Sequence, residues 1–160
     1  MTDFGIARAL HLVMVVLWIG GVGMVTTILL PGIRRSHPPR ERFAAFQAIE
    51  ARFASHSRWT SALAGVSGFY MLWRIDGWDR FLSASFWWMH AMFLTWLMFT
   101  AMLFVAEPLF LHRVLEHRAV RAPESTYRIV ERLHWGLLAL SLVTVAGAAA
   151  GVVGINLADF

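Results

Sequence analysis

The sequence predicts an all-α integral membrane protein, a bundle of four transmembrane helices with an amphipathic cytoplasmic segment before the second helix. Two observations predict this fold class. Of the 160 residues, 58% are hydrophobic, which is more than a soluble domain of this length normally carries. The apolar residues also gather in four runs, and a bilayer core needs about 20 apolar residues as helix. We expect a single domain over residues 1–160.

The four spans follow in order along the chain. The first apolar run ends at Pro31-Gly32, and the second is short, so that residues 53–58 are needed to extend the same helix. The expected spans are about 4–30, 55–73, 86–111 and 133–157.

A further helix is expected over about residues 39–54, before the second span. Prolines at its first turn are a helix-start signal, and apolar residues then recur at spacings of three and four, as in an amphipathic helix. This stripe consists of Phe43, Phe46, Ile49 and Phe53. Two interpretations remain open: a segment lying on the membrane surface, or a simple cytoplasmic extension of the second span.

The arginines predict the orientation. The chain has no lysine, and eleven of its fourteen arginines lie in residues 31–58 and 113–132. Cytoplasmic loops carry an excess of basic residues, so both segments should be cytoplasmic, with both termini periplasmic in a bacterial inner membrane. Cysteine is absent, which excludes disulfides, thiolate metal sites, iron–sulfur clusters and covalently attached haem.

Each predicted span carries one histidine near its start, and these four are His11, His56, His90 and His134. Because consecutive spans run in opposite directions, His11 and His90 should lie near the outer face, and His56 and His134 near the inner face. Two imidazoles on neighbouring helices are a common cradle for b-type haem. The pattern predicts two bis-histidine haems, or one, with levels about 20 Å apart at about 1.5 Å per helical residue.

Glycines and arginines give further candidates for cofactor contact. Gly68 and Gly147 should fall at the outer level and Gly23 at the inner level, where a missing side chain leaves room for a flat ring. Arg8, Arg58 and Arg132 lie two or three residues from a histidine and are candidates for the haem propionates. The plainer alternatives are that the glycines serve helix packing and that the arginines reach lipid phosphate.

Other interpretations of the polar residues stay open. A lone histidine near the membrane interface is often only hydrogen-bonded, and in that case no cofactor is bound. Glu107, beside Pro108, carries protons for a quinone, caps a broken turn or pairs with an arginine at the cytoplasmic rim. Methionines around His90 suggest Cu(I) as an alternative metal, although methionine is also ordinary packing material.

Several short motifs resemble the copper-resistance protein D family. They are Ala9-Leu10-His11-Leu12, Leu17-Trp18-Ile19-Gly20-Gly21, Leu30-Pro31, Pro39-Arg40-Glu41-Arg42, Arg52-Phe53 and Gly68-Phe69-Tyr70-Met71. The first span is also similar, more loosely, to the haem-binding membrane protoporphyrinogen oxidases of the HemJ type, from whose pattern the lack of lysine departs. The resemblance implies a four-helix core that handles copper or haem.

Together these features favour a di-haem b-type cytochrome that passes electrons between the quinone pool and a redox partner protein, as part of a respiratory complex. The competing hypotheses are a copper-handling or transport protein, a HemJ-like protoporphyrinogen oxidase, and an accessory subunit without a cofactor.

Overall fold

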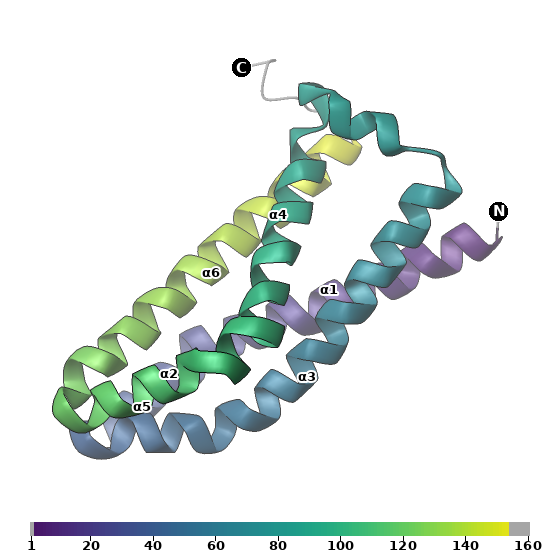
Figure 1. The fold of residues 1–160 in the computed structure, drawn as a ribbon. Coiled ribbons are helices and arrows are strands. Elements are labelled where there is room, and N and C mark those ends of the chain that lie inside the picture. The colour runs from purple at the N-terminus through teal and green to yellow at the C-terminus, as the bar shows by residue number, and fades with distance from the viewer. Residues whose placement is uncertain (1, 154–160) are drawn as a thin grey trace.

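The computed structural model describes residues 2–153, and these residues form helices joined by short connections. Four long helical segments run up and down beside one another (Figure 1). We call the end that holds α2 and α5 the inner end, and the end where α1 begins the outer end. Residues 154–157 of the predicted fourth span lie outside the described residues.

The first long segment continues past the proline where the sequence predicted its end. It consists of α1 (Thr2–Met24), a π-helical stretch η1 (Val25–Leu29) and α2 (Leu30–Ser36). Proline breaks the regular α-helical bonding pattern, and a π-helical stretch is a known accommodation within a helix. The wider turn of η1 lies directly before Pro31, so the helix reaches Ser36 instead of stopping at Leu30.

The second long segment is a single helix, α3 (Pro39–Arg74), which merges the expected amphipathic segment with the expected second span. No proline or glycine interrupts the sequence between the two, so nothing in it ends the helix there. Two residues of the predicted stripe, Phe43 and Phe46, are buried in a core with Val25, Leu30 and Val130. The start of α3 therefore packs against protein through these residues.

The third and fourth segments complete the bundle. After the 3₁₀ turns η2 (Trp78–Leu82) and η3 (Ala84–Phe86), the chain forms α4 (Trp87–Ala101), the π-helical η4 (Met102–Leu111) and α5 (His112–Arg121). The last helix is α6 (Pro123–Val152). Among the described residues, three helical segments are long and apolar enough to cross a membrane: Thr2–Ser36, Ala84–Leu109 and Pro123–Val152.

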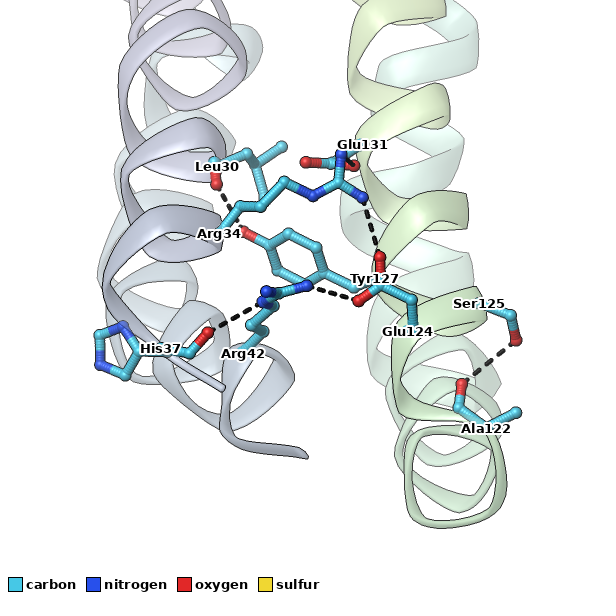
Figure 2. Close-up of polar contacts among 9 residues, drawn as sticks. All are labelled: Leu30, Arg34, His37, Arg42, Ala122, Glu124, Ser125, Tyr127 and Glu131. Atoms are coloured by element: carbon cyan, nitrogen blue, oxygen red, sulfur yellow. Dashed lines mark hydrogen bonds and ion pairs between the residues drawn. The ribbon is translucent and has the colours of Figure 1, made fainter. Parts of the chain in front are cut away.

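An ionic cluster closes the inner end of the bundle (Figure 2). Arg34 of α2 contacts Glu124 and Glu131 of α6 at 3.0 and 3.2 Å, and Arg42 of α3 also pairs with Glu124. Between these charges the fully buried Tyr127 donates its hydroxyl proton to the Leu30 carbonyl at 2.8 Å. The cluster therefore ties three helical segments together at the inner end.

Candidate functional site

His11 lies on α1 and is half-buried against α3. Its Nδ1 is 2.8 Å from the Ala64 carbonyl oxygen and 3.3 Å from the Ser67 hydroxyl. The carbonyl can only accept, so Nδ1 carries the proton and Nε2 keeps its lone pair. A Cβ at Gly68 would lie 3.2 Å from His11 Cε1, so Gly68 does lie at the level of this histidine.

His90, the expected partner of His11, contacts backbone carbonyls of the residues just before it in the sequence. Its Nε2 lies 2.9 Å from the Phe81 carbonyl oxygen and its Nδ1 lies 3.1 Å from that of Phe86. A neutral imidazole has one N–H and can donate to only one of these carbonyls at a time. His11 thus contacts α3, whereas His90 contacts the connection that precedes α4.

The expected inner pair is also divided between two environments. His134 of α6 is half-buried, with its Nδ1 2.9 Å from the Val130 carbonyl and its ring edge-on to Phe46, 5.6 Å between centroids. His56 of α3 has an exposed side chain. Within residues 2–153, no hydrogen bond or ring contact joins His56 to His134.

The protein's own side chains pack against the three glycines that were predicted to leave room for haem. The indole of Trp87 lies over Gly147, so close that a Cβ there would be 2.3 Å from the ring. The Leu138 side chain would lie 3.8 Å from a Cβ at Gly23, and His11 itself covers Gly68. Gly68 and Gly147 therefore allow close packing within the bundle, whereas Gly23 has room for a methyl group.

The three candidate arginines have different surroundings. Arg8 and Arg132 are exposed. Arg58 instead reaches the π-helical η4, where its Nε donates to the Leu103 carbonyl at 3.0 Å and its guanidinium lies 3.1 Å from Glu107. Of the interpretations of Glu107, the structure therefore shows the arginine partner.

The chemistry of proline explains why Arg58 is bound here. In a π-helix each N–H bonds to the carbonyl five residues earlier, so the N–H that Pro108 lacks leaves the Leu103 carbonyl without its helical partner. The Nε–H of Arg58 supplies the missing donor from a neighbouring helix. Arg58 thus has a structural partner that its spacing from His56 did not predict.

All four long segments border one small cavity, which has a volume of about 30 Å³. Its lining includes Trp18 of α1, Ser57 of α3, Met102 of η4 and His134 of α6. Of these residues, His134 was a predicted ligand and Trp18 lies in the motif Leu17-Trp18-Ile19-Gly20-Gly21, whereas Ser57 belongs to no recognisable motif. Only the packing of the helices shows that the three meet at one cavity.

The donor groups at His11 and His134 fit a haem, but the space around them does not. Each imidazole has its Nδ1 turned to a backbone carbonyl, an arrangement that orients axial histidines and leaves Nε2 for a metal. Pockets for cofactors measure about 300–1,000 Å³, roughly ten times this cavity or more. Among the described residues, no group of three or more histidine or acidic side chains is placed to hold a metal ion.

Comparisons with known proteins do not extend these observations. No family model, no curated protein and no solved structure matches the chain.

Proposed function

We propose that the chain crosses a bacterial inner membrane four times, with α3 as the second span, the inner end in the cytoplasm and both termini in the periplasm. Support comes from the three apolar segments of membrane-spanning length and from α3, which runs beside them in the bundle (Figure 1). The arginines of α2, α5 and the first half of α3 gather toward the inner end, as expected on a cytoplasmic face.

The function proposed within this frame is electron transfer by b-type haem, with His11 and His134 as the principal ligands. The observation that carries the proposal is the hydrogen bonding of these two rings. In each, Nδ1–H is bonded to a carbonyl, and the lone pair of Nε2 is left to bind a metal. When bound, a haem supplies an iron that gains and loses one electron. Quinone in the membrane and a redox protein are the proposed exchange partners.

The chain's own residues would first have to make room for such a group. At the outer end, Trp87 would have to leave Gly147, and His90 would have to release the Phe81 carbonyl. At the inner end, the segments around the small cavity would have to separate. Of the two levels we favour the inner one, because π-helical stretches are frequent at functional sites and η4 borders the cavity through Met102 and Leu103.

The test is a count of haem per chain in protein purified from cells that are supplied with haem. We expect a reduced spectrum of haem with nitrogen ligands and a pyridine haemochrome ratio of one or two. His134→Ala should lower that ratio, and where the ratio is two His11→Ala should lower it as well, while the control His117→Ala, at an exposed position of α5, should not. Each variant must first elute as a folded, monodisperse species.

Two results would reject the haem proposal. Folded protein without a Soret band would leave a cofactor-free accessory subunit, and stoichiometric copper with little iron would favour the copper-handling alternative. Complementation of a strain that lacks protoporphyrinogen oxidase tests the third alternative separately.

A further inference from the structure

The small cavity is notable because two of the residues that line it carry polar groups without hydrogen-bond partners. Trp18 is 4% exposed and Ser57 is 2% exposed, and both line the cavity. Neither the Trp18 Nε1 nor the Ser57 hydroxyl has a hydrogen-bond partner in the protein. A buried polar group without a partner is costly, and such groups in native proteins normally bond to protein or to ordered water.

Comparison with other hydroxyls shows that Ser57 is an exception. Serines in helices commonly bond back to the carbonyl four residues earlier, and Ser67 and Ser141 do so at 2.6 and 2.8 Å. Ser57 forms no such bond although it lies within a continuous helix. Its hydroxyl is therefore available to a group inside the cavity.

His134 contributes a third polar atom to the same lining. Its Nδ1–H is bonded to the Val130 carbonyl, so its Nε2 is an acceptor with no protein partner among the described residues. The set is chemically complementary: an indole N–H that can only donate, an imidazole nitrogen that can only accept, and a hydroxyl that can do both.

We propose that this cavity binds a water molecule, which accepts a hydrogen bond from Trp18 Nε1–H, donates one to His134 Nε2 and shares one with the Ser57 hydroxyl. The volume of about 30 Å³ exceeds the roughly 10–15 Å³ that one water requires, and three partners is the usual number for a buried water. The remaining lining residues are apolar, including Val22, Phe99 and Leu103, so their side chains offer the water no further strong hydrogen bond.

The site gives the core a hydrogen-bonded centre that joins α1, α3 and α6 through a molecule that can exchange. Ser57 directly precedes Arg58, whose Nε–H bonds to the Leu103 carbonyl of η4. The water site and this hydrogen bond therefore involve adjacent residues of α3. The inference does not depend on haem and concerns the haem-free protein. If haem is bound to His134, the water must give up its contact with Nε2.

The experiment measures magnetisation transfer from water to indole N–H protons by NMR, on haem-free protein in lipid nanodiscs. Trp87 is the matched control, since its Nε1 is also buried and unpartnered, but its six-membered ring packs on Gly147 and the residue does not line the cavity. We expect a through-space water cross-peak at Trp18 Hε1 and none at Trp87 Hε1. Equal absence at both indoles would overturn the proposal.

A second measurement uses the sign of a stability change. If water is bound, Ser57→Ala removes one of its partners, so the Trp18 cross-peak should weaken and the melting temperature should fall. In a dry cavity the same variant deletes an unsatisfied hydroxyl and the melting temperature should rise, which would reject the site. Ser61→Ala, at an equally buried hydroxyl that contacts Thr100, controls for the loss of a serine.

The outcomes also separate this inference from the proposed function. A water cross-peak in protein that never binds haem leaves the water site intact and rejects the cytochrome. If the protein binds haem but its haem-free form shows no water cross-peak at Trp18, the water site is rejected and the cytochrome proposal stands.

Discussion

Aromatic rings lie directly on glycine backbones at several positions of the core. Trp87 covers Gly147, Trp96 covers Gly65 and Phe53 covers Gly21. At each position a methyl group would lie closer than 3.0 Å to a ring atom, nearer than side chains approach one another. The flat rings that pack on these glycines are therefore tryptophan and phenylalanine side chains of the same chain.

Gly147→Ala should therefore destabilise the protein by about 1–3 kcal/mol, because the Trp87 ring must shift to admit the new methyl group. Gly136 is the control on the same helix, since a Cβ there meets nothing within 4 Å. Gly136→Ala should be neutral or stabilise by up to about 1 kcal/mol through helix propensity. Thermal unfolding in detergent measures both, and equal effects would contradict the packing described.

Arg58→Gln should cost about 2 kcal/mol, because it removes the donor to the Leu103 carbonyl and leaves Glu107 without its cation. Arg132→Gln, at an exposed position, is the control and should change the free energy of unfolding by less than about 0.5 kcal/mol.

The role of Pro108 can be tested in the same series. In a Pro108→Ala background the Leu103 carbonyl gains a backbone N–H partner, so the cost of Arg58→Gln should shrink. Additive effects of the two substitutions would show that Arg58 does not act through that carbonyl.

The sequence could predict the height of a residue in the bundle but not the direction in which it points. Helical rise alone placed Gly68 beside His11. The exposure of His56 depends on how α3 is rotated against its neighbours, and one sequence does not fix that rotation. The partner of Arg58 was hidden for a related reason, because it depends on a π-helical stretch in another segment.

At the scale of elements, apolar runs and helix signals predicted the helices well but not their ends. The first segment continues past Pro31 because the π-helical η1 accommodates the hydrogen bond that proline cannot make. Helix α3 unites two predicted elements because no helix-breaking residue separates them. The apolar stripe of residues 39–54 was found by its period, which is the same whether lipid or protein covers it. Here α2 and α6 cover Phe43 and Phe46.

This difference predicts unequal costs along one stripe. Phe46, which is 3% exposed, packs with Val25, Leu30 and Tyr127, so Phe46→Ala should destabilise by about 3–5 kcal/mol. Ile49 belongs to the same predicted stripe but is 44% exposed, and Ile49→Ala should cost much less. Denaturant titration in micelles distinguishes the two, and similar small costs would indicate that the stripe rests on lipid.

At the scale of the whole molecule, an all-helical fold and three membrane-length segments follow from composition and run length. The second predicted span could not be shown by the same criterion, because α3 combines a charged first half with serines, threonines and a histidine further on. Cysteine labelling tests whether α3 crosses the membrane.

The lack of cysteine makes that experiment simple, since each engineered cysteine is the only thiol in the chain. Arg40→Cys, near the start of α3, and Asp79→Cys, after its end, should react with an impermeant maleimide from opposite sides of the membrane. Arg121→Cys, at the last residue of α5, should react from the same side as Arg40→Cys. Labelling of Arg40→Cys and Asp79→Cys from one side would reject the four-span topology.

The length of α3 has a consequence for the shape of the protein outside the lipid. Its 36 residues rise about 54 Å, whereas the hydrocarbon layer is about 30 Å thick. In a bilayer crossed by α3, roughly 20 Å of folded helix would project as a rigid stalk, fastened by Arg34, Arg42 and Glu124 (Figure 2). A water-soluble protein approaching from that side would then meet a preformed helical platform well above the headgroups.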